Sequence, residues 1–421
     1  MTRRIVFVGD HQARALAHLY RDRVGNGAGE CIRYVDFGSA TRRALHDITA
    51  RADLVLAQLD EDERTRAIDL PAEPATIRFP RLIGTACWPF AVVDDDRRMR
   101  DLLLDRLLRD GVSPAEAARR YLAMDLVRLG HYDHQARQDL ERQRALDAAT
   151  GFALAGAVYE GRRFEQFFLR PHAPSARLIE LLAIQLGERL GLSLTPIAGT
   201  VLPLGEEMPI HPSIVTGAAL GFVARSATYA RAGGTGSTFT EHVLHYLREG
   251  PGPADPLRRA PAPPVPTPRE ARAVDASLHR IETLRKLGAI DEALNLARTL
   301  AAAVPHHGRA LALLASCLKE AGKLSEAEPV ARRASLIDPL STAACNLLAD
   351  IQELQGRRRE ALKLVEAVRD AGFADAQTFS LIGNFRLRGG DRAGAGAAFA
   401  EGLRLDPSRD DLREAIADPA A

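Results

Sequence analysis

The chain has 421 residues, of which 46% are hydrophobic and 26% charged, a balance that excludes a wholly disordered or collagen-like protein. Its 56 lysine and arginine residues stand against 55 aspartate and glutamate residues, which gives a formal net charge of +1. This balance argues against a chain-wide electrostatic grip on nucleic acid, so no nucleic-acid partner is expected. At roughly 150 residues per domain, the length predicts two or three domains.

Cysteine usage and hydropathy bear on where the protein works. Its cysteines form no CxxC pair, which excludes a zinc ribbon and a thioredoxin-type dithiol and is typical of a reducing compartment. The apolar run at residues 5–8 is too short for a secretory signal, and no stretch approaches the roughly 18 apolar residues of a membrane span. We therefore expect a cytoplasmic protein without a membrane span. The cysteines are Cys31, Cys87, Cys317 and Cys345.

The first half of the chain alternates between strand-like and helix-like patterns. Such alternation predicts a mostly parallel sheet covered by helices. The pattern turns mostly helical over residues 96–192, and residues 196–204 are expected to return as a late strand. We therefore expect an α/β domain with a helical insertion over residues 1–250. The expected strands are residues 4–8, 31–37, 53–58 and 76–82, and the expected helices are residues 12–23 and 40–50.

Lysine is absent from the first 285 residues, where arginine carries the fixed positive charge. That part of the chain therefore has no lysine for a Schiff base and none for a Walker A motif. Pyridoxal enzymes and P-loop ATPases are excluded for this region.

Proline marks a boundary after the first domain. Residues 251–268 contain eight prolines, a density that excludes a helix or a central strand and is typical of a semi-rigid linker. We expect the linker over residues 251–272, between a domain at 1–250 and a second domain at 273–421. The alternative is a proline-rich ligand for an SH3-like partner.

The second domain repeats with a period of 34 residues. A glycine between two amphipathic helices allows a tight turn, a small alanine lets the helices approach, and a proline ends the second helix. This pattern resembles the tetratricopeptide repeat, and it predicts an all-α solenoid of four repeats, capped by a helix at 409–417, that binds a protein or peptide partner. The repeated positions are Gly288, Gly322, Gly356 and Gly390; Ala293, Ala327, Ala361 and Ala395; and Pro305, Pro339 and Pro407, with Phe373 in the fourth proline position.

In an open parallel sheet, ligands bind at the carboxyl ends of the strands. The first strand ends in Gly9-Asp10-His11-Gln12, which places an acid and an imidazole at a helix N-terminus. The alternative is that Asp10 only caps the helix. Two more histidines, His172 and His211, also lie at proline-punctuated turns before helix-like segments, where a solvated surface position is the alternative.

These segments resemble the WcbI-type polysaccharide-biosynthesis acetyltransferase family over roughly residues 3 to 225. That family opens with an apolar strand running into Gly-Asn-Cys-Gln and carries a middle and a late His-Pro element. The counterparts in this chain are residues 9–12, the segment from Phe168 to Ser175, and His211-Pro212-Ser213. The resemblance implies that acetyl-coenzyme A, or another acyl-coenzyme A, is bound and that a capsule-type sugar is the carbohydrate acceptor.

The chain departs from the family pattern at its first motif. Asp10 stands where the family has Asn, His11 where it has Cys, and the middle element reads His172-Ala173-Pro174. A thioester on a cysteine is thereby excluded at position 11, which leaves direct acyl transfer, a different acceptor or lost activity. The same pattern is similar to the SGNH hydrolases, although their nucleophilic serine position is again His11.

Direct transfer requires a base, oxyanion donors and groups that hold the coenzyme A phosphates. We predict His211 or His11 as the base, with Asp10 orienting an imidazole, because the imidazole pKa of about 6.5 lies near working pH. Backbone N–H groups around Gly9 and His11, with the Gln12 amide, are the candidate oxyanion donors. The remaining catalytic candidates are His172, as a further catalytic group, and Ser213 beside His211. Arg14, Arg81 and Arg170 are candidates for phosphate binding, with a surface charge as the alternative for each. Trp88 is a candidate for stacking on a sugar or adenine, with a core role as the alternative.

A metal site is not expected, because no HxH, HxxxH or HExxH spacing unites these histidines. The leading hypothesis is an acyltransferase domain recruited through a protein-binding solenoid. The alternatives are a scaffold whose N-terminal domain has lost catalysis and an esterase or other hydrolase on the same site.

Overall fold

The protein is described by a computed structural model that divides into two units. Unit 1 comprises Met1–Met99 and His131–Pro261, and unit 2 comprises Arg100–Gly130 and Ala262–Ala421. The expected linker and the expected strand at 196–204 lie almost wholly outside the described residues, so the domain boundaries stay a prediction. The structure describes residues 3–24, 30–36, 42–60, 75–93, 98–194, 202, 207–222, 229, 238–250, 268–305, 307–337 and 341–417.

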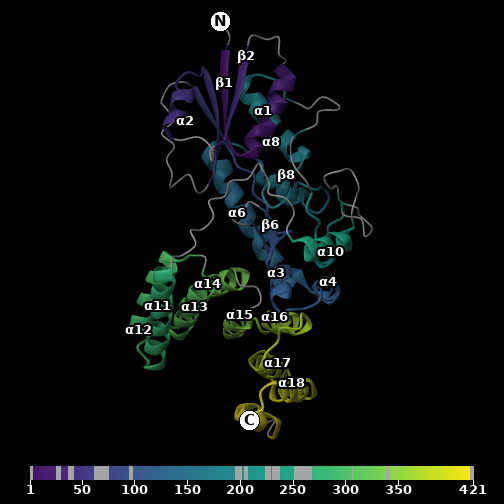
Figure 1. Cartoon of the computed structure of the whole chain (residues 1–421), viewed down its shortest axis with the longest axis vertical. Coiled ribbons are helices and arrows are strands. Elements are labelled where there is room, and N and C mark those ends of the chain that lie inside the picture. The colour runs from purple at the N-terminus through teal and green to yellow at the C-terminus, as the bar shows by residue number, and fades with distance from the viewer. Residues whose placement is uncertain are drawn as a thin grey trace. The chain divides into compact units, whose positions relative to one another are not determined.

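Unit 1 contains the expected parallel sheet (Figure 1). Its strand order is β2-β1-β3-β4, and Ile5 pairs in register with Ile32 on one side and Leu54 on the other. This confirms the predicted α/β class, because each new strand joins the sheet parallel to its neighbour. The strands are β1 (Arg3–Gly9), β2 (Glu30–Asp36), β3 (Leu54–Leu59) and β4 (Ala75–Pro80).

Helices cover both faces of this sheet. Ile5 and Phe7 pack with α1 (His11–Val24) and α8 (Ala176–Leu190) on one face. The alternate residues of β1, Val6 and Val8, pack with α2 (Arg42–Thr49) on the other face. Because side chains alternate along a strand, both faces of β1 are apolar and buried, as a covered parallel sheet requires.

The remainder of unit 1 consists of helices and short strands. The long helix α6 contacts β4, and β7 pairs antiparallel with β8. The glycine-rich run 232–237 lies outside the described residues. The elements are α6 (Tyr132–Thr150), α7 (Ala155–Gly161), β5 (Ala91–Val93), β7 (Phe168–Arg170), β8 (Ala173–Pro174), α9 (Pro212–Gly217) and α10 (Phe239–Glu249); β6 (Met99–Asp101) lies at the change of unit.

Within its described residues, unit 2 contains four consecutive helix pairs and a final helix, which confirms the predicted repeat architecture (Figure 1). The final helix, α19 (Asp410–Ala417), lies where the capping helix is expected. The pairs are α11 (Pro268–Lys286) with α12 (Ile290–Ala303), α13 (Gly308–Glu320) with α14 (Leu324–Ile337), α15 (Thr342–Leu354) with α16 (Arg358–Asp370), and α17 (Ala376–Arg388) with α18 (Arg392–Leu405). Unit 2 also contains three helices from its segment Arg100–Gly130, which are α3 (Leu102–Arg109), α4 (Pro114–Ala123) and α5 (Leu126–Leu129).

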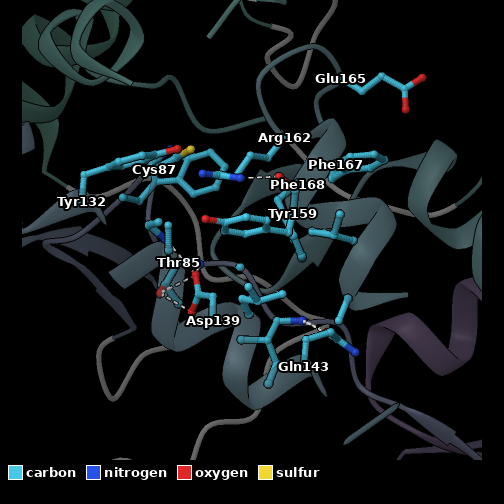
Figure 2. Close-up of a pocket in the computed structure, with 18 of the residues that line it drawn as sticks. Thr85, Cys87, Tyr132, Asp139, Gln143, Tyr159, Arg162, Glu165, Phe167 and Phe168 are labelled. Atoms are coloured by element: carbon cyan, nitrogen blue, oxygen red, sulfur yellow. Dashed lines mark hydrogen bonds between the residues drawn. The ribbon is translucent and has the colours of Figure 1, made fainter. Parts of the chain in front are cut away.

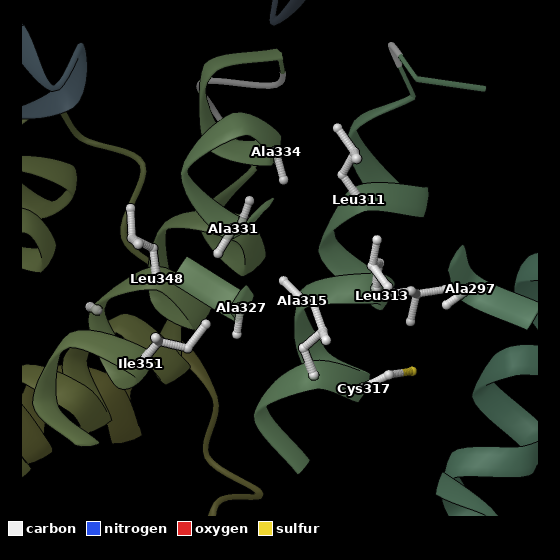
Figure 3. Close-up of a cluster of buried hydrophobic side chains, with 14 of the residues drawn as sticks. Ala297, Leu311, Leu313, Ala315, Cys317, Ala327, Ala331, Ala334, Leu348 and Ile351 are labelled. Carbon is white, nitrogen blue, oxygen red and sulfur yellow. The ribbon is translucent and has the colours of Figure 1, made fainter. Parts of the chain in front are cut away.

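The repeated residues have the conformations that the period implies. Each turn glycine has a positive φ, between 72° at Gly322 and 87° at Gly390, which an L side chain adopts only with strain. The repeated alanines are at most 1% exposed. One of them, Ala327, belongs to the apolar cluster of Figure 3, which also contains Leu311, Leu348 and Ile351. Close helix packing therefore depends on these small residues.

None of the helices in the described ranges is long and apolar enough to cross a membrane.

Candidate functional site

The carboxyl end of β1 is held by a network centred on the Gln12 side chain, which is fully buried. Its amide nitrogen donates to the carbonyl oxygens of Leu82 at 3.0 Å and His172 at 2.7 Å. Its amide oxygen accepts from the Leu82 N–H at 2.8 Å and from the Gln58 amide at 3.1 Å. Both amide hydrogens are therefore used within the protein, so Gln12 has a structural role instead of the oxyanion role expected from the sequence.

Gly9 allows this network to close. A Cβ at position 9 would lie 2.5 Å from the Gln58 amide oxygen and 2.6 Å from the Ala13 Cβ. The close approach of β3 and the first turn of α1, rather than an unusual backbone conformation, requires glycine here.

Asp10 caps α1 and is also an ionised acid in the site. Its carboxylate accepts from the Gln12 N–H at 2.8 Å, as the capping alternative predicts, and it lies 3.3 Å from the Arg81 Nε. Burial alone raises the pKa of Asp10, but His11, Arg81 and the bond from Gln12 outweigh burial and leave that pKa below its ordinary value. The group therefore remains a carboxylate at neutral pH.

The His11 imidazole is 2% exposed and lies beside this carboxylate, with 3.6 Å between His11 Nδ1 and Asp10 Oδ2. The predicted acid–imidazole pair is therefore present at the first helix N-terminus. Arg81 is held by two carboxylates, because it also pairs with Asp60. Its charge is balanced inside the protein, so we assign it to positioning Asp10 rather than to the phosphate binding expected from the sequence.

His172 joins this region through its backbone. Its carbonyl accepts from Gln12, and its N–H donates to the Gly84 carbonyl at 2.9 Å. Its φ of 56° is left-handed, an unusual conformation for a residue other than glycine. The strand end, the segment after β4 and the loop before α8 are thereby connected.

His211 caps α9 with its ring. Its Nδ1 accepts from the Ser213 N–H at 3.1 Å and lies 2.8 Å from the Ser213 hydroxyl. A ring nitrogen that accepts an N–H carries no proton, so in the neutral ring the proton is on Nε2. The Nε2 of His211 can therefore donate a hydrogen bond, and this arrangement argues against His211 as the base, which was one of the two alternatives predicted from the sequence.

A cavity of about 80 Å³ lies behind the segment that follows β4 (Figure 2). Its described lining includes neither Asp10 nor any of the three candidate histidines, so the structure does not gather those imidazoles in this cavity. The predicted Trp88 does line it. The Trp88 ring is buried, and its N–H donates to the carbonyls of Met208 and Pro209, both at 3.1 Å, which favours the core role over stacking on a ligand in the open.

Two of the wall residues, Asp139 and Gln143, belong to a polar stripe of α6 that was not predicted from the sequence. Asp139, Gln143 and Asp147 recur at every fourth residue of α6 and are buried. Asp139 accepts from the N–H groups of Thr85 at 2.6 Å and Ala86 at 3.1 Å, and Gln143 accepts from the Ile83 N–H at 2.9 Å. Polar residues spaced four apart lie on one face of a helix, so the spacing of Asp139, Gln143 and Asp147 could have indicated a helix face that accepts hydrogen bonds from main-chain N–H groups.

Two arginines predicted for phosphate binding remain predictions. Arg14 lies in the first turn of α1, where its N–H donates to the Asp10 carbonyl at 3.1 Å. Arg170 ends β7, two residues before His172. Both side chains are half-buried.

Among the described residues, no group of three or more His, Cys, Asp or Glu is placed to hold a metal ion. Fold and site together define a parallel α/β domain with a polar site at its strand ends, followed by helical repeats. Residues 4–195 match the family model of the polysaccharide biosynthesis enzyme WcbI, and residues 284–342 match that of the tetratricopeptide repeat. The chain therefore carries a WcbI domain and tetratricopeptide repeats.

Solved structures similar to each part include three proteins. One is a structure of WcbI, described as a novel polysaccharide biosynthesis enzyme, in its native form without a disulfide bond between coenzyme A and a cysteine. It is 14% identical to this chain, and the match covers 59% of this chain and 89% of the WcbI chain, with a TM-score of 0.48. A tetratricopeptide-repeat protein of Thermus thermophilus is 21% identical, with coverages of 36% and 83% and a TM-score of 0.33. PilF of Pseudomonas aeruginosa is 20% identical, with coverages of 35% and 68% and a TM-score of 0.33. No curated protein matches the chain.

Proposed function

We propose that the N-terminal unit is an acyltransferase that uses acyl-coenzyme A and acylates a hydroxyl of a sugar or polysaccharide. The observation that carries the proposal is the pair formed by the half-buried Asp10 and the buried His11 at the end of β1, within residues that match a polysaccharide biosynthesis enzyme family. Bound acyl-coenzyme A would supply the activated acyl group. The N-terminus of α1 and the apolar cavity behind Gly84 are compatible with a thioester and a short acyl chain.

His11 is the base in this proposal. Its Nδ1 is the ring nitrogen near the Asp10 carboxylate, which favours the proton on Nδ1 and leaves Nε2 as the basic atom. His11 Nε2 would accept the proton of the attacking hydroxyl and return it to the departing thiol sulfur. The new ester C–O bond then forms as the thioester C–S bond breaks, and no covalent intermediate on the protein is needed.

His211 and the backbone N–H groups near Gly9 and His11 are the proposed donors to the developing oxyanion. The ring of His211 is fixed by its bond from Ser213 and by an edge contact with Phe239, with 5.3 Å between the ring centroids. A donor held in this way does not need to reorganise during the reaction. We further propose that the tetratricopeptide repeats bind a protein or peptide partner and bring the enzyme to its acceptor.

Calorimetry with acetyl-coenzyme A, followed by a thiol-release assay with sugar acceptors, tests this function. We expect binding, and thiol release that depends on a sugar. His11→Gln should retain binding and lower turnover by about 10²- to 10⁴-fold, the usual contribution of a general base. His46→Ala, which changes an exposed histidine of α2, is the matched control.

The other outcomes separate the alternatives. A folded protein that binds no coenzyme A thioester would support a scaffold that has lost catalysis, as the replacement of the family cysteine by His11 suggests. Release of free acid without transfer would support an esterase. Full turnover in His11→Gln would remove His11 from the mechanism.

A further inference from the structure

The cavity behind Gly84 contains an arginine that no described carboxylate neutralises. The Arg162 guanidinium lies over the Tyr159 ring, 3.8 Å from its centroid, and donates to the Tyr159 carbonyl. The Tyr132 side chain lines the same cavity. The Arg162 Nε is buried and has no hydrogen-bond partner in the part of the chain that the structure describes.

The two acids in the described lining are committed elsewhere. Asp139 accepts from the Thr85 hydroxyl at 2.9 Å as well as from the two N–H groups after β4. Glu165 points away from the cavity in Figure 2 and lies 3.7 Å from Arg177. The cavity therefore presents a positive charge whose counterion is not among the described residues, an arrangement that is costly until an anion binds.

The other groups in the cavity remain uncharged. Burial, chiefly, raises the pKa of the Cys87 thiol to about 12, so the thiol stays protonated and is not a nucleophile. Burial also raises the pKa of Tyr132, which keeps its phenol proton available for donation. The rest of the wall is largely apolar and includes Leu140, Val158, Phe167, Phe168 and Ile210.

Position links this cavity to the reaction site. Leu82, which is bonded to Gln12, is followed directly by the lining residues Ile83 and Gly84, and the Gly84 carbonyl accepts from His172. A volume of about 80 Å³ is several times the space of one water and far below that of a whole cofactor. Only a short segment of a ligand can enter.

We propose that this cavity binds a short acyl group that ends in a carboxylate, with Arg162 as its counterion and Tyr132 as a second donor. The apolar walls would contact the methylene carbons of the chain, and the guanidinium would bind the carboxylate oxygens. This assignment rests on the proposed function, because it names the class of acyl group that is transferred.

Two stable thioethers of coenzyme A test the assignment by calorimetry on the full chain. One carries a butyl group and the other a carboxypropyl group, so they have the same number of carbons and differ in the terminal carboxylate. We expect the carboxypropyl ligand to bind at least about tenfold more tightly, the contribution of one charged hydrogen bond. Arg162→Gln should abolish that preference, and Arg162→Lys should retain part of it. Arg163→Gln, which removes an exposed neighbouring charge, should preserve it.

The outcomes distinguish the two proposals. Equal affinity for both thioethers in the unmodified protein, or an unchanged preference in Arg162→Gln, would overturn the assignment of the acyl group and leave the proposed function standing. If neither thioether binds, the proposed function fails and this assignment fails with it. Thermal unfolding of each variant establishes that it is folded.

Discussion

The two parts of the molecule reach their folds by different means. In the repeats, one turn recurs every 34 residues, and each repeat glycine has nearly the same backbone angle. In the N-terminal unit, the Gln12 side chain joins residues 70 and 160 positions away. Because the repeat pattern recurs along the sequence, the fold of the repeats can be predicted from the sequence. The site of the N-terminal unit depends on hydrogen bonds between residues far apart in the sequence, which leave no local sequence pattern.

The largest expected effect on stability comes from breaking the hydrogen-bond network of Gln12. Gln12→Leu would remove the partners of the Leu82 N–H, the buried Leu82 carbonyl and the part-buried His172 carbonyl, each worth about 1 to 3 kcal/mol, so unit 1 should lose about 3 kcal/mol or more. Trp88, the single tryptophan, is buried in unit 1, so its fluorescence reports the unfolding of that unit. Gln138→Leu changes an exposed position of α6 and should alter stability little. Equal losses in the two variants would show that the network is unimportant.

A second prediction concerns helix packing in the repeats. A Cβ at Gly383 of α17 would overlap the ring of the buried Phe399, so Gly383→Ala should cost about 1 to 3 kcal/mol. Gly396 of α18 has no such neighbour, and Gly396→Ala should stabilise by about 0.5 to 1 kcal/mol because alanine favours the helix. Denaturant unfolding followed by far-UV circular dichroism measures both. The same sign for both variants would contradict this account.

Much of the fold was predictable because its signals are local. The apolar runs at residues 4–8 and 53–58 became β1 and β3, and the repeat alanines are buried as the period implied. The Asp10–His11 pair also follows from local sequence, since a short strand leads directly into a helix.

The rest of the site could not be read in this way. Arg81 looks like a candidate for phosphate binding until the fold places it between Asp10 and Asp60, which come from different strand ends. His211 looks like a base until its ring nitrogen is seen to accept from Ser213. Arg162 belongs to no sequence motif. It becomes a candidate binding residue only because it lines a cavity formed by segments far apart in the chain.

The third prediction asks whether replacing a glycine of positive φ by alanine destabilises both units to the same extent. Gly322, between α13 and α14, and Gly191, after α8, have φ angles of 72° and 66° with open space where a Cβ would lie. Replacing either by alanine should cost about 1 to 2 kcal/mol through backbone strain alone. Trp88 fluorescence should report the loss at Gly191, and circular dichroism the loss at Gly322. A much larger loss at Gly191 would show that the turn after α8 carries tertiary contacts as well.

The smallest expected effect is the pH dependence of stability, for which one carboxylate from each unit is compared. Burial raises the pKa of Asp375, which caps α17, but hydrogen bonds from Thr378, Thr342 and Asn346 lower it below the ordinary value, as the contacts of Asp10 do in unit 1. A carboxyl whose pKa falls on folding stabilises the folded state above its unfolded value of 3.8, and this contribution is lost as the pH falls through the folded value.

Both units should therefore lose stability below about pH 4, where these aspartates become protonated. Asp375→Asn should flatten the acid limb of the repeat transition alone, and Asp10→Asn that of unit 1 alone. Urea unfolding at a series of pH values, with tryptophan fluorescence and circular dichroism recorded together, measures the two slopes. If Asp375→Asn instead changed the slope of the tryptophan signal, the two units would not unfold independently, and the contrast between a local and a long-range architecture would not extend to their stability.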